Sequence, residues 1–174
     1  KTTDGGLKWE EGGFNVLPGL HAVRFWNDRN GLVCGDGSDA CPSGMCSTSD
    51  GGRTWKPVPG PRVPGWRGID FNRDGMHGIL AGAWSHLGTL RVDGYHDAEI
   101  DPLSGRTVRG VKLGEELRDG GLRSGFGPSF AVGDGGLVMT SLDGGRKWGF
   151  ANLGLTPAAL ANCDFHCVEA KGQH

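Results

Sequence analysis

Short apolar runs bounded by glycine, asparagine or aspartate recur along the whole chain. The clearest occupy residues 20–25, 31–36, 66–71, 78–82 and 130–140, and a further run begins at residue 160. Runs of about four to eight apolar or alternating residues between turn signals predict β-strands, whereas amphipathic helices need longer segments with helical periodicity. The pattern therefore predicts an all-β fold built from many short strands.

One eight-residue pattern, [Ser/Thr]-x-Asp-Gly-Gly-x-x-Trp, occurs three times, at residues 2–9, 48–55 and 141–148. Asp4 and Asp50 are 46 residues apart, and Asp50 and Asp143 are 93 apart, about twice that distance. A degenerate copy is therefore expected near the midpoint, where Asp93 lies, although Arg91 replaces the hydroxyl residue and no tryptophan follows. Four short strands in each period of this length predict the blades of a β-propeller.

The repeated pattern has a local physical explanation. An aspartate followed by two glycines suits a tight hairpin, because glycine adopts positive φ at little cost and the carboxylate can accept bonds from turn amides. The tryptophan falls on the outgoing strand, where it can pack beneath the turn. These residues are predicted to be scaffold between the third and fourth strands of each blade, not catalysts: Asp4, Gly6, Trp9, Asp50, Gly52, Trp55, Asp143, Gly145 and Trp148.

The repeat divides the chain into units within a single propeller segment, residues 1–174. The predicted boundaries are about 1–16, 17–60, 61–110, 111–154 and 155–174, with an insertion at about 95–116. This division gives about four blades, as part of a larger propeller. An arc of this kind would leave open sheet edges.

The three copies resemble the Asp-box, or bacterial neuraminidase repeat. The double glycine, the run Leu-x-Ala-Val-x-Phe at residues 20–25 and the lead-in at residues 133–141 look most like the photosystem II assembly and stability factor family. The resemblance implies a non-catalytic binding or scaffolding propeller without a cofactor, in the thylakoid lumen, the periplasm or outside the cell. It implies a protein partner, such as a subunit of a photosystem or another membrane-protein complex. The remaining blades or another chain would cover the open edges.

Carbohydrate-active propellers share the same box, so the alternative is a sialidase-like or xyloglucanase-like glycoside hydrolase. A sialidase needs a tyrosine nucleophile activated by a glutamate. The chain has a single tyrosine, Tyr95, and Glu99 follows it at a spacing that carries little information. No catalytic residue is predicted.

Composition and charge narrow the function classes. Glycine accounts for 34 of 174 residues, and glycine within a helix costs about 1 kcal/mol relative to alanine, so a helix bundle is disfavoured. The formal net charge is −2, from 18 basic and 20 acidic residues, which argues against a nucleic-acid partner. No apolar run approaches the roughly 18 residues of a transmembrane helix.

The five cysteines permit two interpretations. Cys41 and Cys46 are separated by a turn-rich spacer, so a local disulfide between them is sterically feasible. Cys34 could join them with a histidine as zinc ligands, but the spacings lack the paired Cys-x2-Cys pattern. Buried or locally bridged cysteine is the favoured interpretation, and no metal site is predicted.

Arginines on or near the first strand of each repeat are the candidate binding residues. Arg24, Arg67 and Arg123 are expected to line the central channel, where a guanidinium can grip a carboxylate in a bidentate way. Ordinary salt bridges with the abundant aspartates are the competing interpretation. Trp26, Trp66 and Trp84 lie outside the boxes and are either ligand platforms or core residues.

Overall fold

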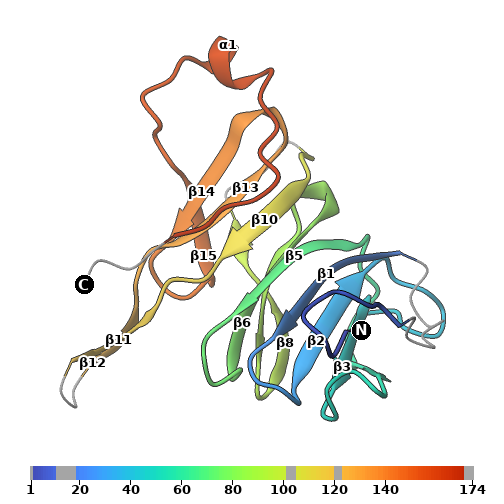
Figure 1. Ribbon diagram of the computed structural model, residues 1–174. Helices are drawn as coiled ribbons and strands as arrows, with labels where there is room; N and C mark the ends of the chain where they lie inside the picture. The colour runs from blue at the N-terminus through green and yellow to red at the C-terminus, as the bar shows by residue number, and fades with distance from the viewer. Residues whose placement is uncertain (1, 11–18, 101–104, 120–122, 171–174) are drawn as a thin grey trace.

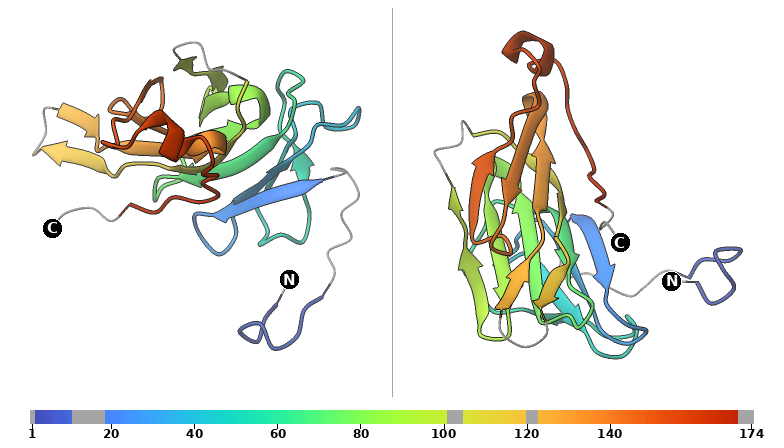
Figure 2. Two further views of the ribbon diagram at one scale, coloured as in Figure 1. Left: turned by 90° about the horizontal axis from the view of Figure 1, so that it is seen from above. Right: turned by 90° about the vertical axis from the view of Figure 1, so that its left-hand side faces the viewer.

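The computed structural model describes residues 2–10, 19–100, 105–119 and 123–170. These residues form three main sheets that lie side by side, each with four antiparallel strands, one of them extended by a fifth strand, and a separate two-stranded hairpin (Figure 1). Seen from above, successive sheets are turned relative to one another like the blades of a fan (Figure 2). We call them blades 1, 2 and 3 in chain order. The prediction of an all-β fold is confirmed.

The strands of each blade follow one another in chain order from the inner to the outer edge, with one insertion in blade 3. Blade 1 contains β1 (Leu20–Phe25), β2 (Gly31–Gly35), β3 (Met45–Thr48) and β4 (Lys56–Pro57). Blade 2 contains β5 (Trp66–Phe71), β6 (His77–Gly82), β7 (Leu87–Arg91) and β8 (Gly94–Asp97). Blade 3 contains β10 (Val108–Lys112), β13 (Ser129–Gly133), β14 (Leu137–Ser141) and β15 (Lys147–Phe150).

The remaining elements lie at the edges and ends of the blades. The short strand β9 (Glu99–Ile100) pairs in parallel with β15. A hairpin formed by β11 (Glu116–Asp119) and β12 (Arg123–Phe126) is inserted between β10 and β13 and extends away from the sheets (Figure 1). Short helical turns occur at η1 (Ala83–Ser85), η2 (Asp134–Gly136) and α1 (Pro157–Leu160).

The predicted insertion at residues 95–116 is wrong in position. That range holds regular elements of two blades, β8 and β10, and the extra segment is the β11–β12 hairpin. The physical reason is that the degenerate turn at Asp93 is short, with Arg91 paired directly with Gly94, so the fourth strand of blade 2 begins earlier than in a blade with a full box. For the same reason the predicted boundary at 110/111 falls inside β10.

The inner strands β1, β5 and β10 lie next to one another and share one irregularity. Their register with the second strand shifts after the first residue, at Leu20/Ala22, Trp66/Gly68 and Val108/Gly110. Such a bulge places one extra residue in each inner strand. Gly68 lets β5 approach β10 closely, because a Cβ there would lie 3.0 Å from the Arg109 carbonyl oxygen.

The core lies between the blades. Leu32, Cys34, Met45, Trp66 and Leu80 are buried between blades 1 and 2. Between blades 2 and 3 the buried residues are Ile79, Ala81, Leu87, Val108, Val111, Leu113, Ala131, Leu137, Met139 and Trp148. On the far side of blade 1, β1 exposes Leu20, Val23 and Phe25.

The residues after α1 return to the inner edge. The Phe165 amide donates to the Gly133 carbonyl, and Glu169 forms an ion pair with Lys112 of β10. This segment therefore lies beside β10 in the same way as β10 lies beside β5. None of the helices in the described ranges is long and apolar enough to cross a membrane.

Candidate functional site

The two ends of the sheets carry different kinds of residue. One end, the Asp-box end, holds the turns between the third and fourth strands. The other end, which we call the turn face, holds the first residues of β1, β5 and β10 and the turns that follow β2, β6 and β13.

The third Asp-box turn forms a closed hydrogen-bond network. The Ser141 hydroxyl donates to Asp143 Oδ1 over 2.8 Å and accepts the Gly145 amide over 2.9 Å. Asp143 Oδ1 also accepts the amides of Arg146 and Lys147, each over 3.0 Å. Gly145 has φ +87°, which an L side chain rarely adopts.

The other two copies repeat these bonds. The hydroxyls of Thr2 and Thr48 donate to Asp4 and Asp50 over 2.8 and 2.9 Å. The amides of Gly6 and Gly52 donate back to the same hydroxyls. Bonds from Lys8 to Asp4 and from Thr54 to Asp50 hold the pKa of both carboxyls below its usual value. Carboxylates so fully engaged by their own turns serve a structural role.

The box tryptophans differ in burial. Nε1 of Trp148 donates to the Gly145 carbonyl over 3.0 Å, and the side chain is only 1% exposed. Trp9 makes the equivalent bond to Gly6 but is 74% exposed. Trp55 is half-buried and meets Phe25 edge-on, with ring centroids 6.0 Å apart.

The turn around Asp93 occupies the equivalent place in blade 2 with a poorer network. It joins β7 to β8, and Asp93 Oδ1 contacts Nε2 of His96 at 3.1 Å in place of a serine or threonine hydroxyl. The substitution of Arg91 for a hydroxyl residue explains the difference.

The turn face gathers basic side chains at one position in all three blades. The bulges of the inner strands place His21, Arg67 and Arg109 there, with side chains 26–35% exposed. Asp36, just after β2, binds both His21 and Arg67, at 3.3 and 2.8 Å. The bond from Arg67 holds the pKa of Asp36 below its usual value.

Asp134, just after β13, repeats the arrangement one blade further on. It accepts a bond from Nε of Arg109. That bond holds the pKa of the arginine above its usual value. Arg106 adds a third guanidinium, whose Nη1 donates to the Gly135 carbonyl over 3.2 Å. Among the described residues, no carboxylate pairs with Arg106.

Arg24 lies on the inner strand β1, as predicted, but not at the register position of Arg67. Its place in the register, opposite Leu32, corresponds to Asp70 in β5 and Lys112 in β10. Asp70 is buried and binds Arg24 Nε at 3.2 Å and Lys112 Nζ at 3.4 Å, and it accepts the Leu113 amide. We call this set, with Glu169, the inter-blade clamp.

Arg123 is not on an inner strand. It lies on β12, paired with Asp119 in the hairpin, and its side chain is outside the described residues. Sequence reasoning missed Arg109, which holds the expected position in blade 3. A signal was present, because Arg67-Gly68-Ile69 and Arg109-Gly110-Val111 share one local pattern.

Cys41 and Cys46, for which the sequence makes a disulfide feasible, are buried and not bonded to each other. The two Sγ atoms are 3.6 Å apart, and all five cysteines are free thiols. Cys41 instead donates to the Met45 carbonyl, and burial raises the pKa of Cys46 to about 12. Within the described ranges, no group of three or more histidine, cysteine, aspartate or glutamate side chains is arranged to hold a metal ion.

Tyr95 and Glu99 do not form the pair that a sialidase would need. The Tyr95 hydroxyl donates to Asp97 over 2.5 Å and contacts His86. Burial and the bond to Asp97 raise the pKa of Tyr95. Glu99 pairs with Lys147 at 3.2 Å. A tyrosine that acts as a nucleophile would need a lowered pKa, not a raised one.

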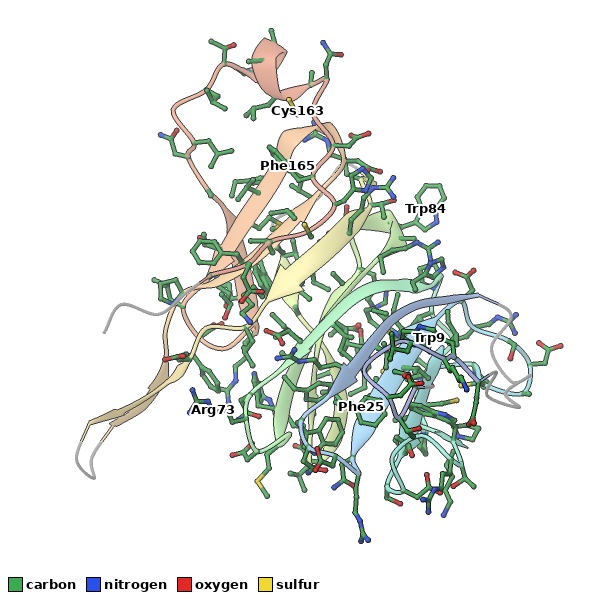
Figure 3. All side chains as sticks on the ribbon, in the orientation of Figure 1. Trp9, Phe25, Arg73, Trp84, Cys163 and Phe165 are labelled. Carbon is green, nitrogen blue, oxygen red and sulfur yellow. The ribbon has the colours of Figure 1, made fainter. Side chains whose placement is uncertain are left out.

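A shallow hollow of about 340 Å³ lies at the Asp-box end between blades 1 and 2. Figure 3 places Phe25 and Arg73 at this end of the molecule. The residues that line the hollow are Arg24, Phe25, Trp26, Phe71, Asn72 and Arg73. Trp26 packs on Phe71, with centroids 4.9 Å apart, so this tryptophan is partly a core residue.

Comparison with family profiles and with curated protein sequences finds no match. Among solved structures, the chain is similar to YCF48 bound to D1 peptide, with a TM-score of 0.55 and 16% identity over 79% of this chain and 43% of that chain. It is also similar to an ancestral GH74 enzyme, with a TM-score of 0.56 and 17% identity over 80% of this chain and 19% of that chain. The chain therefore matches less than half of either protein, and the likeness shows the fold: an open array of β-propeller blades, as predicted.

Proposed function

We propose that the chain belongs to a non-catalytic binding propeller whose turn face holds an acidic segment of a protein partner. The observation that carries this proposal is the row of basic side chains, His21, Arg67 and Arg109, at one register position in three successive blades. A repeated position across successive blades gives a row of basic groups that an extended segment can follow.

The fixed geometry of the arginines supports the same proposal. Asp36 and Asp134 each hold a guanidinium through one of its nitrogens, which orients the side chain and lowers the entropy lost when it binds a ligand. Arg106, without a carboxylate partner in the described part of the chain, adds positive charge beside them. A guanidinium that keeps further N–H donors can bind a carboxylate through two parallel bonds.

The carboxyl groups favour binding over glycoside hydrolysis. A hydrolase needs a carboxyl with a raised pKa as proton donor, close to a second carboxylate. Where the pKa of an aspartate or glutamate is shifted in the described residues, it is lowered: Asp4, Asp36, Asp50, Asp93 and Asp143. Asp70 and Asp134 are each bound by basic side chains.

The finer identity of the partner follows from the sequence resemblance. We infer a role as an assembly or stability factor, or as an accessory subunit, for a membrane-protein complex such as a photosystem. The thylakoid lumen, the periplasm or the cell exterior is the corresponding compartment. The remaining blades or another chain would then cover the exposed apolar residues of β1. The likeness to a protein bound to a peptide supports this role by analogy of fold.

Fluorescence anisotropy with defined peptides tests the proposal. The probes are a labelled ten-residue peptide with four glutamates and the same peptide with four glutamines. We expect the wild-type chain to bind the glutamate peptide more tightly than the glutamine peptide. The double variant Arg106→Gln/Arg109→Gln should bind the glutamate peptide at least tenfold more weakly than the wild-type chain does. The difference in affinity between wild type and variant should be smaller at high salt. The control Arg53→Gln/Arg146→Gln removes two arginines from the Asp-box end.

Equal affinity for both peptides, or equal losses in the two double variants, would contradict the proposal. Melting curves of each variant verify that the fold is kept. Release of sugars from xyloglucan or a sialoside by the wild-type chain would instead support the hydrolase alternative.

A further inference from the structure

The turn between β6 and β7 has a strained backbone. Trp84 and Ser85 have φ of 56° and 61°, and they are the two non-glycine residues with positive φ in the described part of the chain. The equivalent turn of blade 3 has Gly135 and Gly136, with φ of 62° and 70°. A side chain in this region of backbone conformation is strained, whereas glycine adopts it freely.

Surrounding bonds hold the turn in this conformation. The Ser85 amide and hydroxyl both donate to the Arg106 carbonyl, over 2.7 and 2.9 Å. The Ala83 amide donates to the Gly65 carbonyl, and the His86 amide donates to the Ala83 carbonyl. Because the bonds involve backbone groups and Ser85, they do not require a tryptophan at position 84.

Burial of the tryptophan does not offset the strain. Trp84 is 74% exposed, whereas Trp66 of the same blade is fully buried in the core. Figure 3 shows the Trp84 ring projecting away from the sheets, at the opposite end from Phe25 and Arg73. A large aromatic side chain held in solvent by a strained turn is typical of a binding residue.

The position of Trp84 connects it to the basic row. Its turn is bonded to Arg106, Arg106 is bonded to Gly135 in the next blade, and Asp134 holds Arg109. The Trp84 ring itself lies beside Gly105, the residue before Arg106, because a Cβ there would be 3.7 Å from the ring. Tryptophan and arginine side chains are enriched at interface hot spots.

We propose that Trp84 is the aromatic anchor of the turn face and binds an apolar side chain of the partner segment whose acidic residues contact Arg106 and Arg109. This assignment rests on the proposed function and adds the partner's chemistry: an acidic segment with an aliphatic or aromatic residue beside its carboxylates. The indole supplies apolar contact area at small entropic cost, and the neighbouring guanidiniums supply charge complementarity.

The test uses Trp84→Gly with two labelled acidic ten-residue peptides, one with a central leucine and one with serine in its place. For the wild-type chain we expect the leucine peptide to bind at least fivefold more tightly. For Trp84→Gly we expect this preference to disappear while the weaker, salt-dependent binding of both peptides remains. Because glycine relieves the strained φ, we also expect an unchanged or higher melting temperature.

The matched control is Val92→Gly, which removes another highly exposed apolar side chain (82% exposed) from a turn of the same blade at the Asp-box end. It should keep the leucine preference. The role of Trp84 as an anchor is refuted if the wild-type chain binds both acidic peptides equally, or if Trp84→Gly still prefers the leucine peptide. The proposed function stands in either case. If neither acidic peptide binds, both are refuted.

Discussion

Asp143 holds the third Asp-box turn together through bonds to Ser141, Arg146 and Lys147. Asp143→Ala removes the common acceptor, and we expect the free energy of unfolding in urea to fall by about 1–2 kcal/mol, allowing for solvent exposure. Asp93→Ala, in the degenerate turn where the carboxylate contacts His96 and no hydroxyl residue stands two positions earlier, should lose less. Equal losses would contradict the structural role of the box network.

The same residue predicts a pH dependence. Burial alone would raise the pKa of Asp143, but bonds from the Lys147 amide, the Ser141 hydroxyl and the Arg146 amide outweigh it, so the pKa lies below 3.8. A lowered pKa in the folded state adds stability above pH 3.8, and this stability is lost as the pH falls through the lowered value. Asp143→Asn should therefore show a shallower loss of stability between pH 4 and pH 2, roughly the range in which these groups titrate.

Local sequence was enough to predict the residues of the turns. Ser141, Asp143 and Gly145 interact within five positions of one another, so their spacing alone determines which bonds they can form. The left-handed conformation of Trp84 could not be predicted in this way. It depends on a bond from Ser85 to Arg106, which is distant in sequence.

At the scale of elements, the inter-blade clamp connects the inner strands. Buried Asp70 on β5 binds Arg24 of β1 and Lys112 of β10. Asp70→Ala leaves Arg24 and the Leu113 amide without this acceptor and leaves Lys112 with Glu169 alone, and we expect a loss of about 3 kcal/mol in the free energy of unfolding. The control Asp39→Ala removes an exposed partner of Arg62 and should have almost no effect. Similar melting curves for both variants would contradict the clamp.

Strand register explains which elements of the site were predicted and which were not. Arg67 was placed correctly on an inner strand because its apolar neighbours predict that strand. Arg24 also lies on an inner strand, but only the register shows that its position corresponds to Asp70. Arg123 lies on the inserted hairpin and not on an inner strand. In blade 3, the position that corresponds to Arg67 is occupied by Arg109 on β10.

For the whole molecule, the repeat period predicted the blade architecture of a partial propeller. The described strands form blades 1 to 3 and the separate two-stranded β11–β12 hairpin. Residues 2–9 form a complete turn network, and residues 163–170 lie along β10, at the two ends of this array. The fan of three blades brings Arg67, Arg106 and Arg109 to one end and the Asp-box turns to the other.

Hydrogen–deuterium exchange of the chain with and without the acidic leucine peptide tests the central claim most directly. The account predicts slower exchange on binding in the turn face, at residues 83–86, 105–109 and 134–136. It predicts unchanged exchange in the Asp-box turns at residues 48–55 and 141–148. Protection confined to those turns, or to the far side of blade 1, would contradict the claim that the turn face is the binding surface.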